Sequence, residues 1–151
     1  MRYLFIILLL CIYVQLSLGY VVNSDYQKKF FLLKVEEERI TQYKVNLINA
    51  IISKESEGKD TAMGDMVGIL QIRPVMVREV NNILGYIKYT LKDRIDRMKA
   101  IEMFRIYTDH HTPDWNMELV CRRWNGGYKG ETKFETYQYY REVKQILNKT
   151  I

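Results

Sequence analysis

Residues 47–56 read Leu-Ile-Asn-Ala-Ile-Ile-Ser-Lys-Glu-Ser, and this stretch decides the fold that the sequence predicts. Three isoleucines and one carboxylate recur at helical spacing: Ile48, Ile51, Ile52 and Glu55. These positions share one face of an α-helix, the face that turns toward the core. A carboxylate there is poorly hydrated, so its pKa should rise and it can keep a proton to donate near neutral pH. The alternative is that Glu55 bends into water at the helix end, since acids are rarely buried without a partner.

The apolar spacing on either side predicts a chain of helices. Their expected limits are Lys44–Ser56, Pro74–Leu84, Lys92–Tyr107, a helix that Asp114 caps and Gly126-Gly127 end, and a last helix from near Glu135 to Leu147. Proline suits the first turn of a helix, and glycine suits its end. In the third helix, Ile95, Met98 and Ile101 share the expected apolar face. No alternating strand pattern exceeds a few residues, so we expect a mainly α fold.

The first 19 residues have the pattern of a secretory signal. Arg2 precedes an apolar run over Leu4–Val14, and the small residues Ser17 and Gly19 follow. We expect cleavage after Gly19 and export to the periplasm, the cell envelope or the medium. An uncleaved N-terminal anchor is one alternative. Lipidation at Cys11 is another, although the leucines before it lack the small side chain that such a site requires.

The remaining residues suit one compact domain. We expect a leading helix or linker over residues 20–43 and the domain itself over residues 44–151. Cys121 is the one cysteine left after cleavage, so neither an intrachain disulfide nor a cysteine metal site is expected. Adjacent histidines point to different sides of a helix, and His110-His111 has no third ligand at suitable spacing. We therefore expect a pair in a loop or at a helix end there, and no metal.

The charge of the chain is modestly basic. Arg2 is the one charged residue among the first 19, so the remainder has 22 basic and 18 acidic residues and a formal charge of +4. Such a balance suits an anionic envelope polymer or surface, and it equally serves solubility alone. No cluster of Lys and Arg with interleaved aromatics indicates nucleic-acid binding.

Four short motifs follow one another along the chain. They are Glu55-Ser56, Gly68-Ile69-Leu70-Gln71 with Pro74, Trp124-Asn125-Gly126-Gly127, and Glu135-Thr136-Tyr137-Gln138-Tyr139. In this order and spacing they resemble the soluble lytic transglycosylase and goose-type lysozyme superfamily over roughly residues 44–147. The resemblance implies a small, single-domain, lysozyme-like fold and no cofactor. Trp124 stands where the family has Tyr, and Arg73 stands where some relatives carry an apolar Met.

The resemblance also implies roles for single residues. Glu55 corresponds to the catalytic acid of the family. The candidate substrate-binding residues are Ser56, Gly68, Gln71, Asn125 and Tyr139. Gly68 would let the backbone approach a glycan closely, and the Tyr139 hydroxyl would lie near the acid. From the residues alone, simpler roles stay open: Gln71 satisfying loop backbone, Asn125 capping a helix, and Tyr139 belonging to the core.

The reaction implied is cleavage of the β-1,4 bond between N-acetylmuramic acid and N-acetylglucosamine in peptidoglycan. Glu55 would act as acid and then as base, giving a 1,6-anhydro-muramoyl product. Hydrolysis by inversion requires a second carboxylate, for which Asp65 and Asp60 are candidates, although Gly64-Asp65 also suits a simple turn. We expect a lytic transglycosylase.

Two alternatives stay open: a hydrolytic muramidase on the same bond, and a non-catalytic glycan-binding or structural envelope module. The expected partners are peptidoglycan glycan strands, together with envelope or secretion-apparatus proteins, and we expect a monomer.

Overall fold

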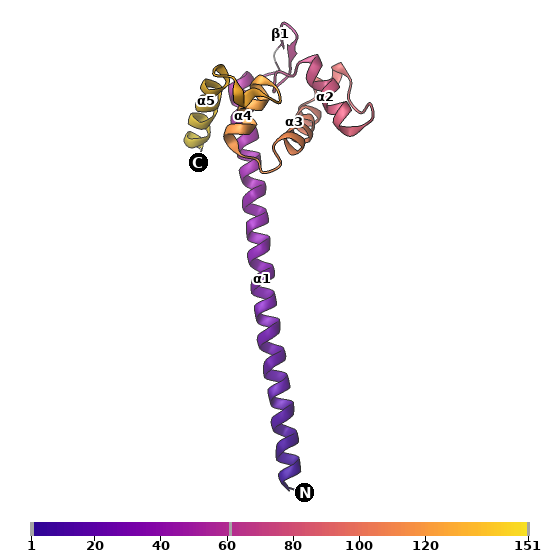
Figure 1. Cartoon of the computed structure of the whole chain (residues 1–151), viewed down its shortest axis with the longest axis vertical. Coiled ribbons are helices and arrows are strands. Elements are labelled where there is room, and N and C mark those ends of the chain that lie inside the picture. Colours follow the sequence, from indigo (N-terminus) through magenta and orange to yellow (C-terminus); the bar gives the residue numbers. More distant parts are fainter. Residues whose placement is uncertain (1, 61, 151) are drawn as a thin grey trace. The chain divides into compact units, whose positions relative to one another are not determined.

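The computed structural model describes the backbone of residues 2–60 and 62–150, and the side chains of residues 25–60 and 62–149. Contacts divide it into two units, Met1–Gln42 and Tyr43–Ile151. Its elements (Figure 1) are α1 (Arg2–Ser56), β1 (Ala62–Met63), β2 (Met66–Val67), α2 (Pro74–Leu84), η1 (Leu91–Arg94), α3 (Arg97–His111), α4 (Met117–Gly126), η2 (Gly130–Thr132) and α5 (Glu135–Thr150). The expectation of a mainly α fold is therefore confirmed.

The first unit consists of the N-terminal part of α1. We expected a separate helix to begin at Lys44, and this is wrong, because α1 continues unbroken to Ser56. Residues 20–56 contain neither Gly nor Pro, so nothing in the sequence interrupts the helix. The side chains expected to form a signal sequence, residues 1–19, lie outside the described side chains. Among the side chains described, no helix has the length and apolar character needed to cross a membrane.

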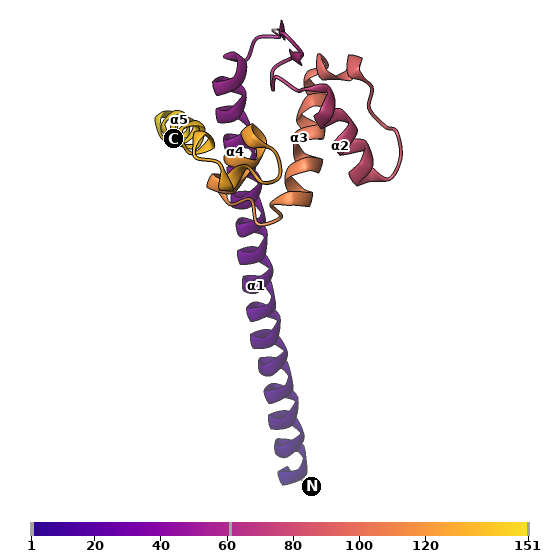
Figure 2. The ribbon, with the colours of Figure 1, turned by 45° about the horizontal axis from the view of Figure 1, so that its top comes forward.

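The second unit holds the core. The apolar face predicted for residues 47–56 is confirmed, since Ile48, Ile51 and Ile52 are buried. α2 packs against α3, and α4 packs against α5 (Figures 1 and 2). Ten of the most deeply buried side chains are Leu47, Ile51, Ile69, Leu70, Ile72, Val80, Met103, Phe104, Cys121 and Val143. Burial raises the pKa of the Cys121 thiol to about 12.

Two predicted helix starts are wrong. Asp96 caps α3 by accepting from the backbone N–H groups of Met98 and Lys99, so the helix expected near Lys92 is split into η1 and α3. As a result Ile95 and Met98 are 57% and 74% exposed and do not form the expected apolar face.

At the start of α4, the capping residue is Asn116 and not Asp114. The Asn116 side chain accepts from Leu119 N, while Asp114 accepts from the backbone of Asn116, before the helix begins. Pro74–Leu84 and the ends at Gly85 and Gly126 agree with prediction.

A small hairpin occupies the segment predicted as a loop. β1 and β2 pair antiparallel, with Ala62 opposite Val67 and Met63 opposite Met66, and Gly64-Asp65 forms the turn. Strands of two residues are too short to show alternation in the sequence. After β2, Val67 pairs with Ile72, so residues 68–71 form a tight turn between them.

Gly68 fixes this tight turn in place. Its φ is +78°, in the left-handed region, and a Cβ added there would lie 2.1 Å from the carbonyl oxygen of Arg94. The close approach that glycine permits is thus made by the backbone of η1. This differs from the glycan contact expected from the sequence.

Gly68→Ala should lower the free energy of unfolding by about 2–3 kcal/mol, because a strained φ costs about 1–2 kcal/mol and the clash adds to it. Urea unfolding measures this. Gly64→Ala is the matched control, because Gly64 also has positive φ but open space around it. Equal losses in the two variants would show that contact with Arg94 contributes nothing.

Candidate functional site

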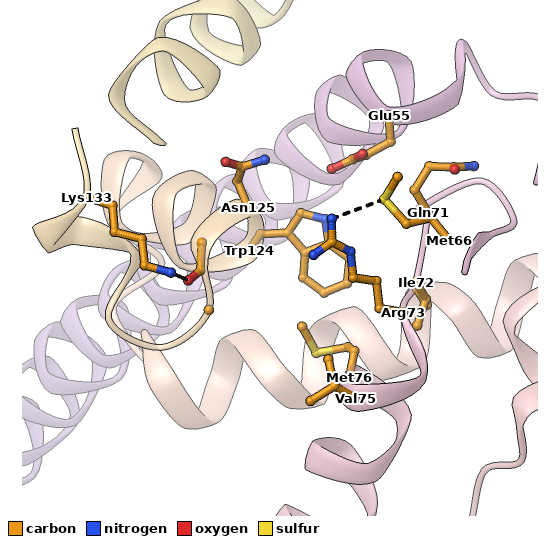
Figure 3. Close-up of a pocket in the computed structure, with 12 residues that line it drawn as sticks. Glu55, Met66, Gln71, Ile72, Arg73, Val75, Met76, Trp124, Asn125 and Lys133 are labelled. Carbon is orange, nitrogen blue, oxygen red and sulfur yellow. Dashed lines mark hydrogen bonds between the residues drawn. The ribbon is translucent and has the colours of Figure 1, made fainter. Parts of the chain in front are cut away.

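A cavity of about 300 Å³ lies within the second unit (Figure 3). Such a volume is at the lower end of the range for small-molecule sites. Its wall combines one carboxylate, two cations, two amides and an apolar surface. The lining residues are Glu55, Met66, Gln71, Ile72, Arg73, Val75, Met76, Trp124, Asn125, Gly126, Gly127 and Lys133. We call this cavity the Glu55 pocket.

Glu55 lies in the last turn of α1, where the helix passes from the core to the pocket. Its carboxyl is partly buried, and burial raises its pKa above the ordinary value. Hydrogen bonds from Tyr139 and Trp124, and the charges of Lys54 and Arg73, act in the opposite direction but are smaller effects. Glu55 therefore holds its proton to higher pH than a solvated carboxyl does.

Tyr139 orients this carboxyl. It projects from α5, is 7% exposed, and its hydroxyl donates to Glu55 Oε1 at 2.7 Å. Burial and the neighbouring carboxyl raise the pKa of the Tyr139 phenol well above 10, so the hydroxyl stays a donor. The proximity of Tyr139 to the acid that the resemblance implied is present in the structure.

Ser56 lies beside the acid but holds the fold. Its hydroxyl is 2.8 Å from the carbonyl oxygen of Ile69 and 3.3 Å from that of Ile52. These contacts tie the end of α1 to the turn at residues 68–71. Neither Ser56 nor Gly68 lines the pocket, so the structure gives both a positioning role in place of the substrate contact expected.

Gln71 and Asn125 do line the pocket, Gln71 from the turn at residues 68–71 and Asn125 from α4. Gln71 is buried, with a φ of +48°, and its side-chain amide donates to the carbonyl oxygen of Gly68 at 2.8 Å. The simpler role considered for Gln71, satisfying loop backbone, is therefore real and coexists with its place in the wall. Asn125 is exposed near the end of α4 and faces the pocket without capping that helix.

Trp124 forms part of the apolar wall. The ring of Phe104 packs edge-on against it with 4.7 Å between the ring centroids, and the ring of Tyr107 does so with 5.9 Å between the centroids. Edge-to-face packing of this kind holds an aromatic ring in a defined orientation. Trp124 thus presents an indole of fixed orientation to the pocket, and its side chain lowers the Glu55 pKa slightly against the larger effect of burial.

The candidate second carboxylates do not join Glu55. Asp65 is exposed in the hairpin turn, and its backbone oxygen accepts from Arg94 Nη1 at 2.8 Å. Asp60 is also exposed. Among the described residues, Glu55 is the one carboxylate in the pocket wall.

Arg73 and Lys133 also line the pocket, although the sequence did not predict them as site residues. Arg73 immediately precedes α2, and its place between Gln71 and Pro74 is the sequence signal that could have indicated it. Lys133 carries no sequence signal. Arg122 donates to the carbonyl oxygen of Glu131, within η2, and to that of Lys133, directly after η2. These contacts hold the segment that brings Lys133 to the pocket.

The helix expected to end at Tyr107 continues to His111, so the histidine pair lies in the last turn of α3, with the two rings at 89° to each other. His111 Nε2 lies 3.3 Å from a carboxylate oxygen of Glu79. Within the part of the chain that the structure describes, no three His, Cys, Asp or Glu side chains gather as a metal site.

Tyr139→Phe should raise the pKa of Glu55 further, because the lost hydroxyl hydrogen bond favours the ionised carboxyl. Carbon-detected NMR titration of the Glu55 carboxyl measures the change. Tyr140→Phe, on the same helix, serves as control and should leave the titration unchanged. A Glu55 pKa that falls or stays constant in Tyr139→Phe would contradict the assigned contact.

Glu55→Gln should raise the free energy of unfolding at neutral pH. The folded state holds the Glu55 proton above the pH at which the unfolded chain releases it. Wild-type stability therefore falls as pH rises through this interval. The gain should vanish near pH 3, where the carboxyl is protonated in both states, and urea unfolding at both pH values measures it. A gain of equal size at both pH values would contradict a buried acid.

Comparison of the chain with known protein families, with curated proteins and with solved structures finds no match.

Proposed function

We propose that the protein is a lytic transglycosylase with a lysozyme-like fold that cleaves peptidoglycan glycan strands in the cell envelope. The observation that carries this proposal is Glu55, a carboxyl with a raised pKa in the wall of a cavity of about 300 Å³, held by the Tyr139 hydroxyl. The order of the four motifs supports the same reading, and Gln71 and Asn125 add amides that suit sugar hydroxyl and acetamido groups.

The chemistry needs one carboxyl in two protonation states. Protonated Glu55 donates to the glycosidic oxygen as the bond to the anomeric carbon breaks. The resulting carboxylate then takes the proton of the muramoyl 6-hydroxyl as that oxygen attacks the anomeric carbon. A raised pKa favours the first step, and the Tyr139 hydrogen bond stabilises the carboxylate needed for the second.

The pocket favours this route over hydrolysis. Inverting hydrolysis places a second carboxylate about 6.5–9.5 Å from the acid, where it activates a water. Both acidic residues of the hairpin segment, Asp60 and Asp65, are exposed and outside the wall of the pocket. Intramolecular attack by the 6-hydroxyl requires no such group, so Glu55 alone suffices.

Export is part of the same proposal, because the substrate lies in the cell envelope. The signal-like pattern of residues 1–19 supports it. The basic excess of the chain also suits a wall polymer that carries carboxylates.

Glu55→Gln should reduce the release of soluble muropeptides from purified cell walls by at least about 100-fold, the usual contribution of a general acid. Mass spectrometry of the wild-type products should show 1,6-anhydro ends, which are lighter than reducing ends by one water. The matched control is Glu57→Gln, because Glu57 is an exposed acid two residues away that pairs with Lys59. It should retain activity.

Other outcomes would replace the proposal. Reducing ends in the wild-type products would indicate a muramidase that hydrolyses the same bond. Binding to walls without any release of muropeptides would indicate a glycan-binding module. Full activity in Glu55→Gln would remove Glu55 from the mechanism.

A further inference from the structure

The wall of the Glu55 pocket carries two cations beside its one carboxyl group. Arg73 and Lys133 both line it, and neither forms an ion pair among the described residues. Lysines elsewhere in the second unit do: Lys54 lies 2.6 Å from Glu142, and Lys88 lies 2.6 Å from Glu102. We call Arg73 and Lys133 the cationic pair.

The contacts of the cationic pair are weak or incomplete for charged groups. Arg73 Nη2 lies 3.6 Å from the thioether sulfur of Met66, a poor acceptor. Lys133 Nζ donates to the carbonyl oxygen of Gly126 at 2.5 Å and carries two further protons. A guanidinium has five N–H donors in a planar fork that matches a carboxylate. Both side chains thus retain donors for an anion.

Glu55 does not supply that anion while it is protonated. Burial outweighs the effect of Arg73 on its pKa, so in the acid form the pocket has two positive charges and no negative one. Arg73 and Lys133 are both exposed, so an anion can reach them from solvent, and Met66, Ile72, Val75, Met76 and Trp124 add apolar surface to the same pocket wall. Figure 3 shows Arg73 and Lys133 reaching the pocket from different segments of the chain.

We propose that the cationic pair binds a carboxylate attached to the muramoyl lactyl group of the substrate, so that the pocket selects anionic glycan over neutral glycan. This inference rests on the proposed function, because that function places a muramoyl residue beside Glu55. The carboxylate has two sources in peptidoglycan: the free lactyl acid of a peptide-stripped strand, or an acid of the attached peptide stem. Both present the same chemistry to Arg73 and Lys133.

Binding to four glycans tests the proposal, with Glu55→Gln in the full chain to prevent cleavage. Stripped strands and peptide-bearing strands are each used with native carboxylates and after carbodiimide amidation. Calorimetry should give at least about tenfold tighter binding to the native form of one or both strands. The strand type that shows the difference identifies the source of the carboxylate.

Neutral replacements then assign the effect to residues. Arg73→Gln and Lys133→Gln, each added to Glu55→Gln, should weaken binding of the native glycan about three- to tenfold and leave binding of the amidated glycan unchanged. The matched control is Arg78→Gln, because Arg78 is an exposed cation on α2 outside the pocket wall. It should change neither affinity.

Equal binding of the native and amidated forms would overturn the proposal, and so would absence of binding to all four glycans. Equal weakening of both forms by Arg73→Gln and Lys133→Gln would do the same, since it indicates a purely structural role. Wall cleavage by the wild type is measured separately. Cleavage without a charge preference would remove the carboxylate subsite and keep the proposed function. A charge preference without cleavage would remove the proposed enzymatic function and leave a pocket that binds anionic glycan.

Discussion

The hydrogen bond from the Ser56 hydroxyl to the carbonyl oxygen of Ile69 is the contact on which the site depends. Ser56 ends α1 and directly follows Glu55, so this bond fixes the backbone of the acid and the turn at residues 68–71 together. The turn is closed by Gly68 against Arg94 and then leads into Arg73 and α2. One buried hydroxyl thereby sets the distance between the carboxyl and the opposite wall, and its burial in the core keeps water from competing for the bond.

Around Glu55, two physical effects on the carboxyl pKa oppose each other, and burial is the larger one. Burial favours the neutral acid, while the Tyr139 hydroxyl, the Trp124 side chain and two nearby cations favour the carboxylate. A group that must release a proton and then take one back needs both forms within reach. Loss of the burial, or loss of the contacts that favour the carboxylate, would leave a carboxyl suited to one of the two steps only. The unfavourable burial is offset by the packing of Ile51 and Ile52 in the preceding turn of α1.

Local signals predicted most of the fold and part of the site. Val77 and Val80 with Gly85 located α2, and the spacing of Ile48, Ile51 and Ile52 placed Glu55 on the inner face. The misplaced starts of α3 and α4 arose because several residues near each start can cap a helix, and tertiary packing selected Asp96 and Asn116. Lys133 could not be found from sequence, because its position depends on how Arg122 holds η2. Ser56 and Gly68 were expected to bind substrate, whereas the contacts that the structure gives them are with distant backbone, which spacing does not reveal.

Cys121 has a consequence for the surroundings in which the second unit can exist. Its thiol is fully enclosed in the core, and a pKa of about 12 leaves almost no thiolate at neutral pH. Oxidants and disulfide-exchanging partners act on thiolate, so they find no reactive sulfur there. The packing of this unit is thus indifferent to whether the surrounding medium is reducing or oxidising.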